Sequence, residues 1–182
     1  MIGNFLLAVR SWFAKTIEWQ NAVGAASEDE AKSRIYLKDL QFDFEHGDWF
    51  GADEEADGAI GQPSPEIVRP FMVIGTPTKI MRARQKHNTA MGTVTVVVER
   101  DLAELGMANP ELDEALRNAP IALFVDWVDD LNHGFLEALH VTPGGAPAIN
   151  NSDIANVYRP NAREEVVEGD FGRAALQITY GV

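Results

Sequence analysis

The chain has 182 residues, of which 46% are apolar and 24% are charged, and its formal net charge is −13 at pH 7. This balance is typical of a globular protein with a buried core, and the length suits one domain, so we predict a single domain over residues 1–182. The absence of cysteine excludes disulfide bonds, thiolate catalysis and metal sites with cysteine ligands. The strong acidity argues against a general affinity for DNA or anionic lipid, because like charges repel at long range.

Apolar residues recur at helical spacing in the first 17 residues and predict an amphipathic helix with one wide apolar face. The apolar run Phe5–Val9 is too short for the core of a signal peptide, and Arg10 and Lys15 follow it rather than precede it. No stretch approaches the roughly 20 apolar residues that a membrane span needs. We therefore expect a helix that stays in a cytoplasmic protein.

The segment after this helix is expected to turn and then to enter a sheet. Gly24 is the expected end of the first helix, and Ser27 followed by Glu30 is the capping-box signature of a short helix that runs to about Ile35. Residues 35–46, IYLKDLQFDFEH, alternate apolar and polar side chains and predict one strand. Residues 45–66 are rich in Asp, Glu, Gly and Pro without a helical or strand period, and predict an acidic surface loop inserted between paired strands.

Two further strands are expected to form the centre of the sheet, at residues 69–81, RPFMVIGTPTKIM, and at residues 92–100, GTVTVVVER. The β-branched residues of the second segment favour a strand that is covered on both sides. The connection between the two strands is a predicted β-hairpin. At the mouth of this hairpin the sequence gathers four of its 15 Lys and Arg residues, which are Lys79, Arg82, Arg84 and Lys86.

These four cations fit a contact with a partner or subunit, a solvated hairpin or a contact with nucleic acid. No aromatic residue is interleaved with them, so stacking on single-stranded bases is unsupported. A basic arm on an acidic protein suits an acidic surface on another copy, since head-to-tail rings join complementary and non-identical surfaces. We therefore predict a subunit or partner interface at the four cations, with Trp49 and Phe50 of the acidic loop as interface anchors.

The middle of the chain predicts one dominant helix. Asn109 with Pro110, and again Asn118 with Pro120, are helix-start signals, so we expect a short helix, a break and a long helix to about His140. The stripe of this long helix that we expect to be buried contains Ile121, Phe124, Val125, Val128, Leu131, Phe135, Leu136 and Leu139.

The last 40 or so residues predict strands joined by acidic or turn-rich segments. The expected order is a loop at 142–153, a strand at 154–160, an acidic bend at 163–170 and a final strand at 173–181. In the final strand, the residues expected to point inward are Ala174, Leu176, Ile178 and Tyr180. Strands grouped on either side of one long helix indicate an α+β fold, in which a mostly antiparallel sheet with a long β-hairpin packs against the N-terminal helix and the long central helix.

Motifs that carry chemistry are scarce. GxGxxG, Walker, HExxH and GxSxG patterns are absent from the sequence. The best metal candidate is Asp129 with His133, at i and i+4 on the predicted helix, with Asp126 and His140 one or two turns away. A divalent-metal hydrolase that uses these four residues is one alternative function, and the other reading of the pair is a solvent-exposed helix face. No second cluster completes a ligand set, so we expect no cofactor and no catalytic site.

Two segments carry a resemblance to a known group of proteins. One is EDEAKSRIYL at residues 28–37, and the other is GDFGRAALQITYG at residues 169–181, where an acidic Gly-Asp-aromatic turn leads into the last strand. Together with the order of helix, hairpin, long helix and acidic turn, they resemble the tail-terminator (tail-completion) proteins and related neck proteins of long-tailed bacteriophages. The insertion at 45–66 departs from the smaller members of this group.

The resemblance implies a non-enzymatic structural protein located in the tail or neck of the virion and assembled in the host cytoplasm. Such proteins form a ring, usually a hexamer, which caps the tail tube and joins it to the neck connector. DNA passes through the lumen without specific binding, and an acidic wall would reduce the attraction of phosphate. The implied partners are further copies of the chain, a tail-tube protein and a neck or connector protein, with no membrane. A head-completion (stopper) protein of the neck is the alternative within the same class, and a peptide- or small-molecule-binding module is another.

Overall fold

The structure, a computed structural model, describes residues 2–38, 40–43, 48–51, 69–75, 80–82, 90–107, 113–140, 148–160 and 170–181. Its helices are α1 (Ile2–Lys15), α2 (Ile17–Val23), α3 (Glu28–Lys32), α5 (Leu102–Met107), α6 (Glu114–Arg117) and α7 (Pro120–His140). Its strands are β1 (Ile35–Lys38), β2 (Leu40–Asp43), β3 (Asp48–Gly51), β4 (Phe71–Gly75), β5 (Ile80–Arg82), β6 (Ala90–Asp101), β7 (Ala148–Tyr158) and β8 (Phe171–Gly181). The predicted α+β fold is confirmed.

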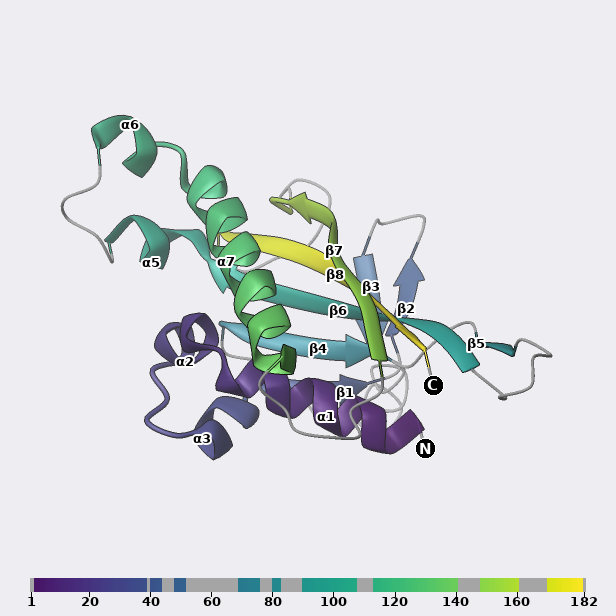
Figure 1. The fold of residues 1–182 in the computed structure, drawn as a ribbon. Helices are drawn as coiled ribbons and strands as arrows, with labels where there is room; N and C mark the ends of the chain where they lie inside the picture. Colours follow the sequence, from purple (N-terminus) through teal and green to yellow (C-terminus); the bar gives the residue numbers. More distant parts are fainter. Residues whose placement is uncertain are drawn as a thin grey trace, which may run out of the picture.

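One mostly antiparallel sheet organises the chain, with the strand order β1-β4-β6-β8-β7 and with β5 paired to the beginning of β6 (Figure 1). Only β1 and β4 run parallel among the pairs of this sheet, and β2 and β3 form a separate antiparallel pair. The β6–β8 pairing is continuous from Met91 opposite Gly181 to Asp101 opposite Phe171. As predicted, β6 is a central strand, because β4 and β8 flank it.

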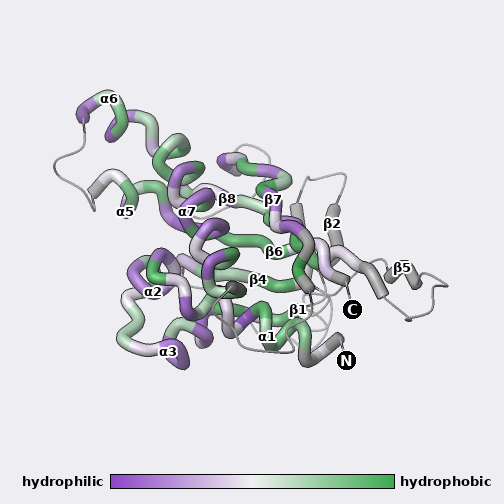
Figure 2. Tube along the Cα trace, viewed as in Figure 1, coloured by the Kyte–Doolittle hydropathy of each residue, from purple (hydrophilic) through white to green (hydrophobic). Residues whose placement is uncertain are grey.

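Alternation along the strands produces two different sheet faces. On one face Val94, Val96 and Val98 of β6 are fully buried, beside Leu176 and Ile178 of β8. Helices α1 and α7 cover this face, and the strands beneath them are the most apolar part of the chain (Figure 2). The four residues of β8 that we predicted to point inward are all buried there. We call this side the helix-covered face.

The two covering helices contact each other through aromatic side chains. Phe13 of α1 stacks on Phe135 of α7, with ring centroids 4.2 Å apart and an interplanar angle of 12°. Both side chains are fully buried, and burial of a large apolar side chain stabilises a fold by roughly 1.5–3 kcal/mol. The structure therefore confirms that the sheet packs against the N-terminal helix and the central helix.

The predicted first helix is two helices, α1 and α2, that are separated by Thr16. The backbone of Thr16 is extended, with ψ of 137°, and its buried hydroxyl donates to the carbonyl oxygen of Phe13 at 2.8 Å. The helix is interrupted at Thr16, and this side-chain hydrogen bond caps the end of α1. The expectation of one uninterrupted helix was therefore wrong. Gly24 ends α2 in the left-handed conformation, with φ of 65°, as expected.

The predicted capping box of α3 is present in a modified form. The Ser27 hydroxyl accepts a hydrogen bond from the backbone N–H of Glu30 at 3.3 Å. The Glu30 carboxylate accepts from the backbone N–H of Ala26 at 2.7 Å, one residue before the cap. The helix is shorter than predicted, because it ends at Lys32 and Ile35 already belongs to β1.

The single strand predicted at 35–46 was wrong, and so was the prediction that residues 45–66 contain no strand. The segment divides into β1, in the main sheet, and β2, which pairs with β3 inside the predicted acidic loop. The register places Phe42 opposite Trp49, and aromatic residue types favour strands even within an acidic sequence. The strands on either side of 45–66 do pair, as β1 with β4, but in parallel. The other residues of the predicted loop, 45–47 and 52–66, lie outside the described residues.

The central helix differs from its predicted stripe at two positions. Val125 is exposed, and Trp127 is buried instead, because α5, which the sequence did not predict, packs beside α7. The short helix α6 starts from an Asp113 cap, whose side chain accepts from the N–H of Ala115 at 2.8 Å. The predicted start at Asn109 lies outside the described part of the chain.

Strand β7 begins at Ala148, so the predicted loop over 142–153 was wrong for residues 148–153. Ser152 in this segment is bonded to α7: the Asn132 side-chain amide donates to the carbonyl oxygen of Ser152 at 3.0 Å, and the Ser152 hydroxyl donates back to the Asn132 side chain. Two register shifts, at Ile149/Asn151 and at Ile154/Asn156, interrupt the pairing of β7 with β8.

The substitution Gly172→Ala should destabilise the fold by about 1–3 kcal/mol, because overpacking a filled core forces shifts. A Cβ at Gly172 would lie 2.5 Å from Cδ1 of Phe124. Urea unfolding measures the change. The matched control is Gly3→Ala in α1, where a Cβ meets nothing within 4 Å and the helix should gain up to about 1 kcal/mol. Equal effects of the two substitutions would contradict the packing of Phe124 on β8.

The substitution Tyr180→Phe should not lower stability at pH 7, because the buried Tyr180 hydroxyl has no hydrogen-bond partner in the part of the chain that the structure describes. Burial raises the pKa of this phenol above its ordinary value of 10.0. Stability that depends on the protonated phenol is thus complete below pH 10 and is lost as the pH rises further. Unfolding free energies measured between pH 7 and 11 should fall less steeply above pH 10 in the variant than in the parent protein.

Candidate partner interface

The two described strands of the predicted hairpin pair with each other, and β5 lies at the end of the sheet away from α5 and α6 (Figure 1). Strand β5 pairs with the beginning of β6 through Ile80 opposite Gly92 and Arg82 opposite Ala90. Of the four cations predicted as interface residues, Arg82 lies in β5 with only its backbone described. Lys79, Arg84 and Lys86 lie outside the described residues. We call the segment 79–92, which includes β5, the basic segment and the start of β6, the arm.

The predicted aromatic anchors lie on the second, smaller sheet. Trp49 and Phe50 are neighbours in β3, where Trp49 is opposite Phe42 and Phe50 is opposite Gln41. Their environment lies outside what the structure describes, and their role as anchors stays a prediction.

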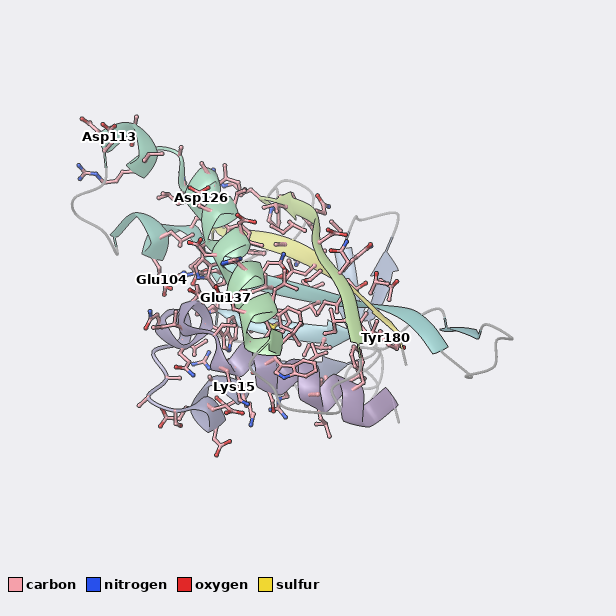
Figure 3. All side chains as sticks on the ribbon, in the orientation of Figure 1. Lys15, Glu104, Asp113, Asp126, Glu137 and Tyr180 are labelled. Carbon is pink, nitrogen blue, oxygen red and sulfur yellow. The ribbon has the colours of Figure 1, made fainter. Side chains whose placement is uncertain are left out.

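The outer side of α7 forms an acidic surface. Asp126, Asp129, Asp130 and Glu137 are exposed on it, as predicted, and α7 contains no Lys or Arg. Glu104 of α5 and Asp113 before α6 extend the negative charge toward the end of the molecule that is opposite to β5 (Figure 3). Among the described residues, β5, which contains Arg82, and this acidic helical region thus lie toward opposite ends of the protomer. We call the second region the acidic helical surface.

The metal candidate of the sequence lies within this surface. Asp126, Asp129 and His133 share the exposed side of α7, and His140 is the last residue of the helix. The His133 Nε2 atom lies 3.3 Å from Glu137 Oε1, and both side chains are well exposed. Within the described ranges, no group of three or more His, Asp or Glu side chains could hold a metal ion. The observed arrangement is that of an exposed helix pair.

A buried charge network, which the sequence analysis missed, occupies the other face of the sheet. Glu99 of β6 is 3% exposed and receives two arginines: Arg173 Nε donates to its Oε1 at 2.6 Å, and Arg69 Nε donates to its Oε2 at 2.9 Å. Arg173 also donates to the Tyr158 hydroxyl at 3.1 Å. The Arg69 guanidinium lies over the Phe171 ring, 3.6 Å from its centroid. The network thus joins β6, β7 and β8 to the segment that enters β4.

A signal for this network is present in the sequence. Glu99 and Arg173 are charged residues in two otherwise apolar strands, and the register places them directly opposite each other. Opposite charges at facing positions of antiparallel strands attract. Arg173 alternates with the inward residues of β8 and so lies on the face away from the helices, where its side chain is buried rather than solvated.

No known protein family matches the chain, and no curated protein is similar to it in sequence. Among the described helices, none is long and apolar enough to cross a membrane.

The substitution Glu99→Gln should destabilise the protein by about 3–5 kcal/mol, because it leaves the buried Arg173 and the partly buried Arg69 without their carboxylate. Urea unfolding at neutral pH measures this change. The control is Asp170→Asn, which breaks the bidentate pair of Asp170 with Arg159 at 2.6 and 2.7 Å. That pair is about half exposed, so its loss should cost less than about 1 kcal/mol. Similar losses in both variants would contradict the structural importance of the Glu99 network.

Proposed function

We propose that this protein is a non-enzymatic structural subunit of a long-tailed phage particle, which forms a ring at the head-proximal end of the tail and joins the tail tube to the neck. A tail terminator is the favoured role, and a head-completion protein of the neck is the alternative within the same class. The sequence segments that resemble tail-terminator proteins fold as α3 with β1 and as the central strand β8. They therefore belong to the framework of the fold rather than to its surface loops.

The observation that carries the proposal is the separation of opposite charges on one protomer. The backbone of Arg82 lies in β5 at one end of the sheet, and the acidic helical surface lies over α7 and continues to α5 and α6 toward the other end (Figure 1). Lys79, Arg84 and Lys86 are close to Arg82 in sequence. Two different, complementary surfaces on one chain allow head-to-tail association, which closes into a ring when the rotation between copies permits it. A two-fold dimer needs a self-complementary surface instead.

The net charge is consistent with a channel through which DNA moves. At −13 per protomer, a ring multiplies the negative charge around its lumen. Phosphates close to such a wall are repelled, so the DNA is not retained by non-specific contacts. The runner-up from another class is a hydrolase that uses Asp126, Asp129 and His133, and it predicts a metal-dependent activity that His133→Ala abolishes.

Native mass spectrometry and negative-stain electron microscopy of the purified protein test the ring directly. We expect a closed oligomer of defined size, alone or after addition of the tail-tube protein encoded by the same genome. A protein that stays monomeric at high concentration and binds no tail protein would contradict the proposed function. A metal that is retained on purification and is required for hydrolysis would favour the enzyme instead.

Reversal of the charge at both Arg82→Glu and Arg84→Glu should weaken assembly while the fold stays intact, since surface charge changes move stability by less than about 0.5 kcal/mol. Sedimentation velocity over a concentration series measures assembly, and circular dichroism checks the fold. We expect wild-type assembly to weaken as salt rises, because salt screens exposed charges.

Two further variants, which change the net charge equally, test whether assembly depends on the position of the charge or only on the net charge. Arg82→Gln with Arg84→Gln changes the net charge by −2, and so does Lys15→Glu on the exposed last turn of α1. Only the arm variant should weaken assembly. If both variants assemble like the parent protein, the interface role of the arm is wrong.

A further inference from the structure

Two buried hydrogen-bond donors without acceptors lie side by side between the sheet and α7. Arg100 Nε and Trp127 Nε1 are both buried, and neither has a hydrogen-bond partner among the described residues. The Arg100 guanidinium carbon lies 4.7 Å from the centroid of the Trp127 ring. Trp127 is 9% exposed, so its indole N–H is withdrawn from bulk water. We call this pair the donor site.

The fold places both residues there for simple reasons. Arg100 follows Val94, Val96 and Val98 along the same side of β6, so its side chain leaves the sheet toward the helices. The residue opposite it on β8 is Gly172, which lacks a side chain and is covered by Phe124. Trp127 is one helical turn after Phe124, with the ring centroids 5.8 Å apart. The aromatic pair therefore forms an apolar wall beside the guanidinium.

The charge of Arg100 is not neutralised within the described part of the chain. Burial lowers the pKa of its guanidinium, and the nearby carboxylate of Glu104 raises it by less. Glu104 is exposed, one turn further along the chain in α5, and no ion pair joins it to Arg100. Asp126 and Asp130 flank Trp127 on α7, but both are exposed to solvent. A partly buried cation without a hydrogen-bonded counter-ion is costly, and so is a buried N–H without an acceptor.

We propose that the donor site binds a carboxylate group, which an acidic side chain of a neighbouring copy supplies in the assembled ring. Two donors need a group with at least two acceptor atoms, and a cation needs a negative one, so a carboxylate satisfies both at once. The chain offers 28 Asp and Glu residues against 15 Lys and Arg, so carboxylates are the polar groups that a second copy presents most often. This inference rests on the proposed ring and adds a second contact, next to α5 and remote from the arm.

The main test compares Arg100→Met with Lys15→Met, which removes an exposed cation from the same helical layer. Sedimentation velocity gives the protein concentration at half-assembly. We expect Arg100→Met to raise that concentration at least about tenfold, because truncation of one member of a desolvated charge pair mainly speeds dissociation. We expect Lys15→Met to leave it unchanged. The melting temperature of unassembled Arg100→Met should not fall below that of the wild type, since an unpaired cation is removed.

A third variant separates the neighbouring copy from Glu104 as the source of the carboxylate. If a neighbouring copy supplies the carboxylate, Arg100→Met should raise the half-assembly concentration by the same factor in a Glu104→Gln background as in the wild type, whatever Glu104 contributes to the acidic helical surface. If Glu104 itself is the natural partner of Arg100, Glu104→Gln should lower the melting temperature, and Arg100→Met should have no further effect on assembly in that background. That second result would overturn the proposal.

The indole N–H of Trp127 reports on the site directly. Its ¹H–¹⁵N resonance, assigned with Trp127→Phe, should shift as wild-type protein is concentrated through the assembly transition, and Arg100→Met should not show the shift. Acetate and a short DNA duplex are the probes for other sources of the anion. An Arg100-dependent shift with DNA, or no shift with any of the three, would overturn the proposal.

Failure of the ring and failure of the donor site give different results. Wild type and Arg100→Met that assemble equally well would refute the donor site and leave the ring intact. A wild type that never assembles would refute the ring and with it the neighbouring copy as the source. In that case an acetate-induced shift that depends on Arg100 would show that the site takes a free carboxylate.

Discussion

The long antiparallel pairing of β6 with β8 is the constraint on which the rest of the molecule depends. Its register, from Met91 opposite Gly181 to Asp101 opposite Phe171, decides which side chains face the helices. A slip of one residue would exchange the valines of β6 with Thr93, Thr95 and Glu99, and so would bury polar groups under α1 and α7. The same register aligns Glu99 with Arg173 on the opposite face. Packing on one side and ion pairing on the other therefore select the same alignment.

The two ends of this strand pair carry the two proposed contacts. At one end β6 continues past the body to pair with β5 and to support the arm. At the other end the sheet leads directly into α5, and Arg100 lies beneath Trp127. In the proposed ring, a rigid ladder between the two contact regions would fix the angle at which successive copies meet. Stiffness in the centre of the sheet would therefore matter for ring closure as much as the contacts themselves.

Local patterns in the sequence predicted the elements that local physics controls. The valines of β6, the inward residues of β8 and the Gly24 cap follow from strand alternation and from left-handed backbone conformation. Features that depend on distant neighbours were missed. The division between β1 and β2 depends on pairing with β4 and β3, and the burial of Trp127 in place of Val125 depends on α5. The start of β7 depends on Asn132, which is 20 residues away from Ser152 along the chain.

The candidate sites divide in the same way. The basic segment was visible as a local excess of charge, and the structure adds that its flanking strands pair. The candidate metal site was predicted from the spacing of Asp129 and His133 on one helix. Among the described residues, no group of three or more possible ligands forms there. Neither the Glu99 network nor the donor site had a local signature, because each joins strands or helices that are far apart in sequence. Charged residues inside apolar strands were the one available clue.

The irregular pairing of β7 has a consequence for how copies can join. β7 is the last strand on its side of the described sheet, and its two register shifts disturb the even spacing of backbone groups that a further strand would need. The strand at the other side, β1, has only four residues. Neither border is suited to extending one continuous sheet from copy to copy. Contacts between subunits would then be made by side chains, whose strength responds to salt and pH, and a particle could complete its tail without the risk of uncontrolled fibre growth.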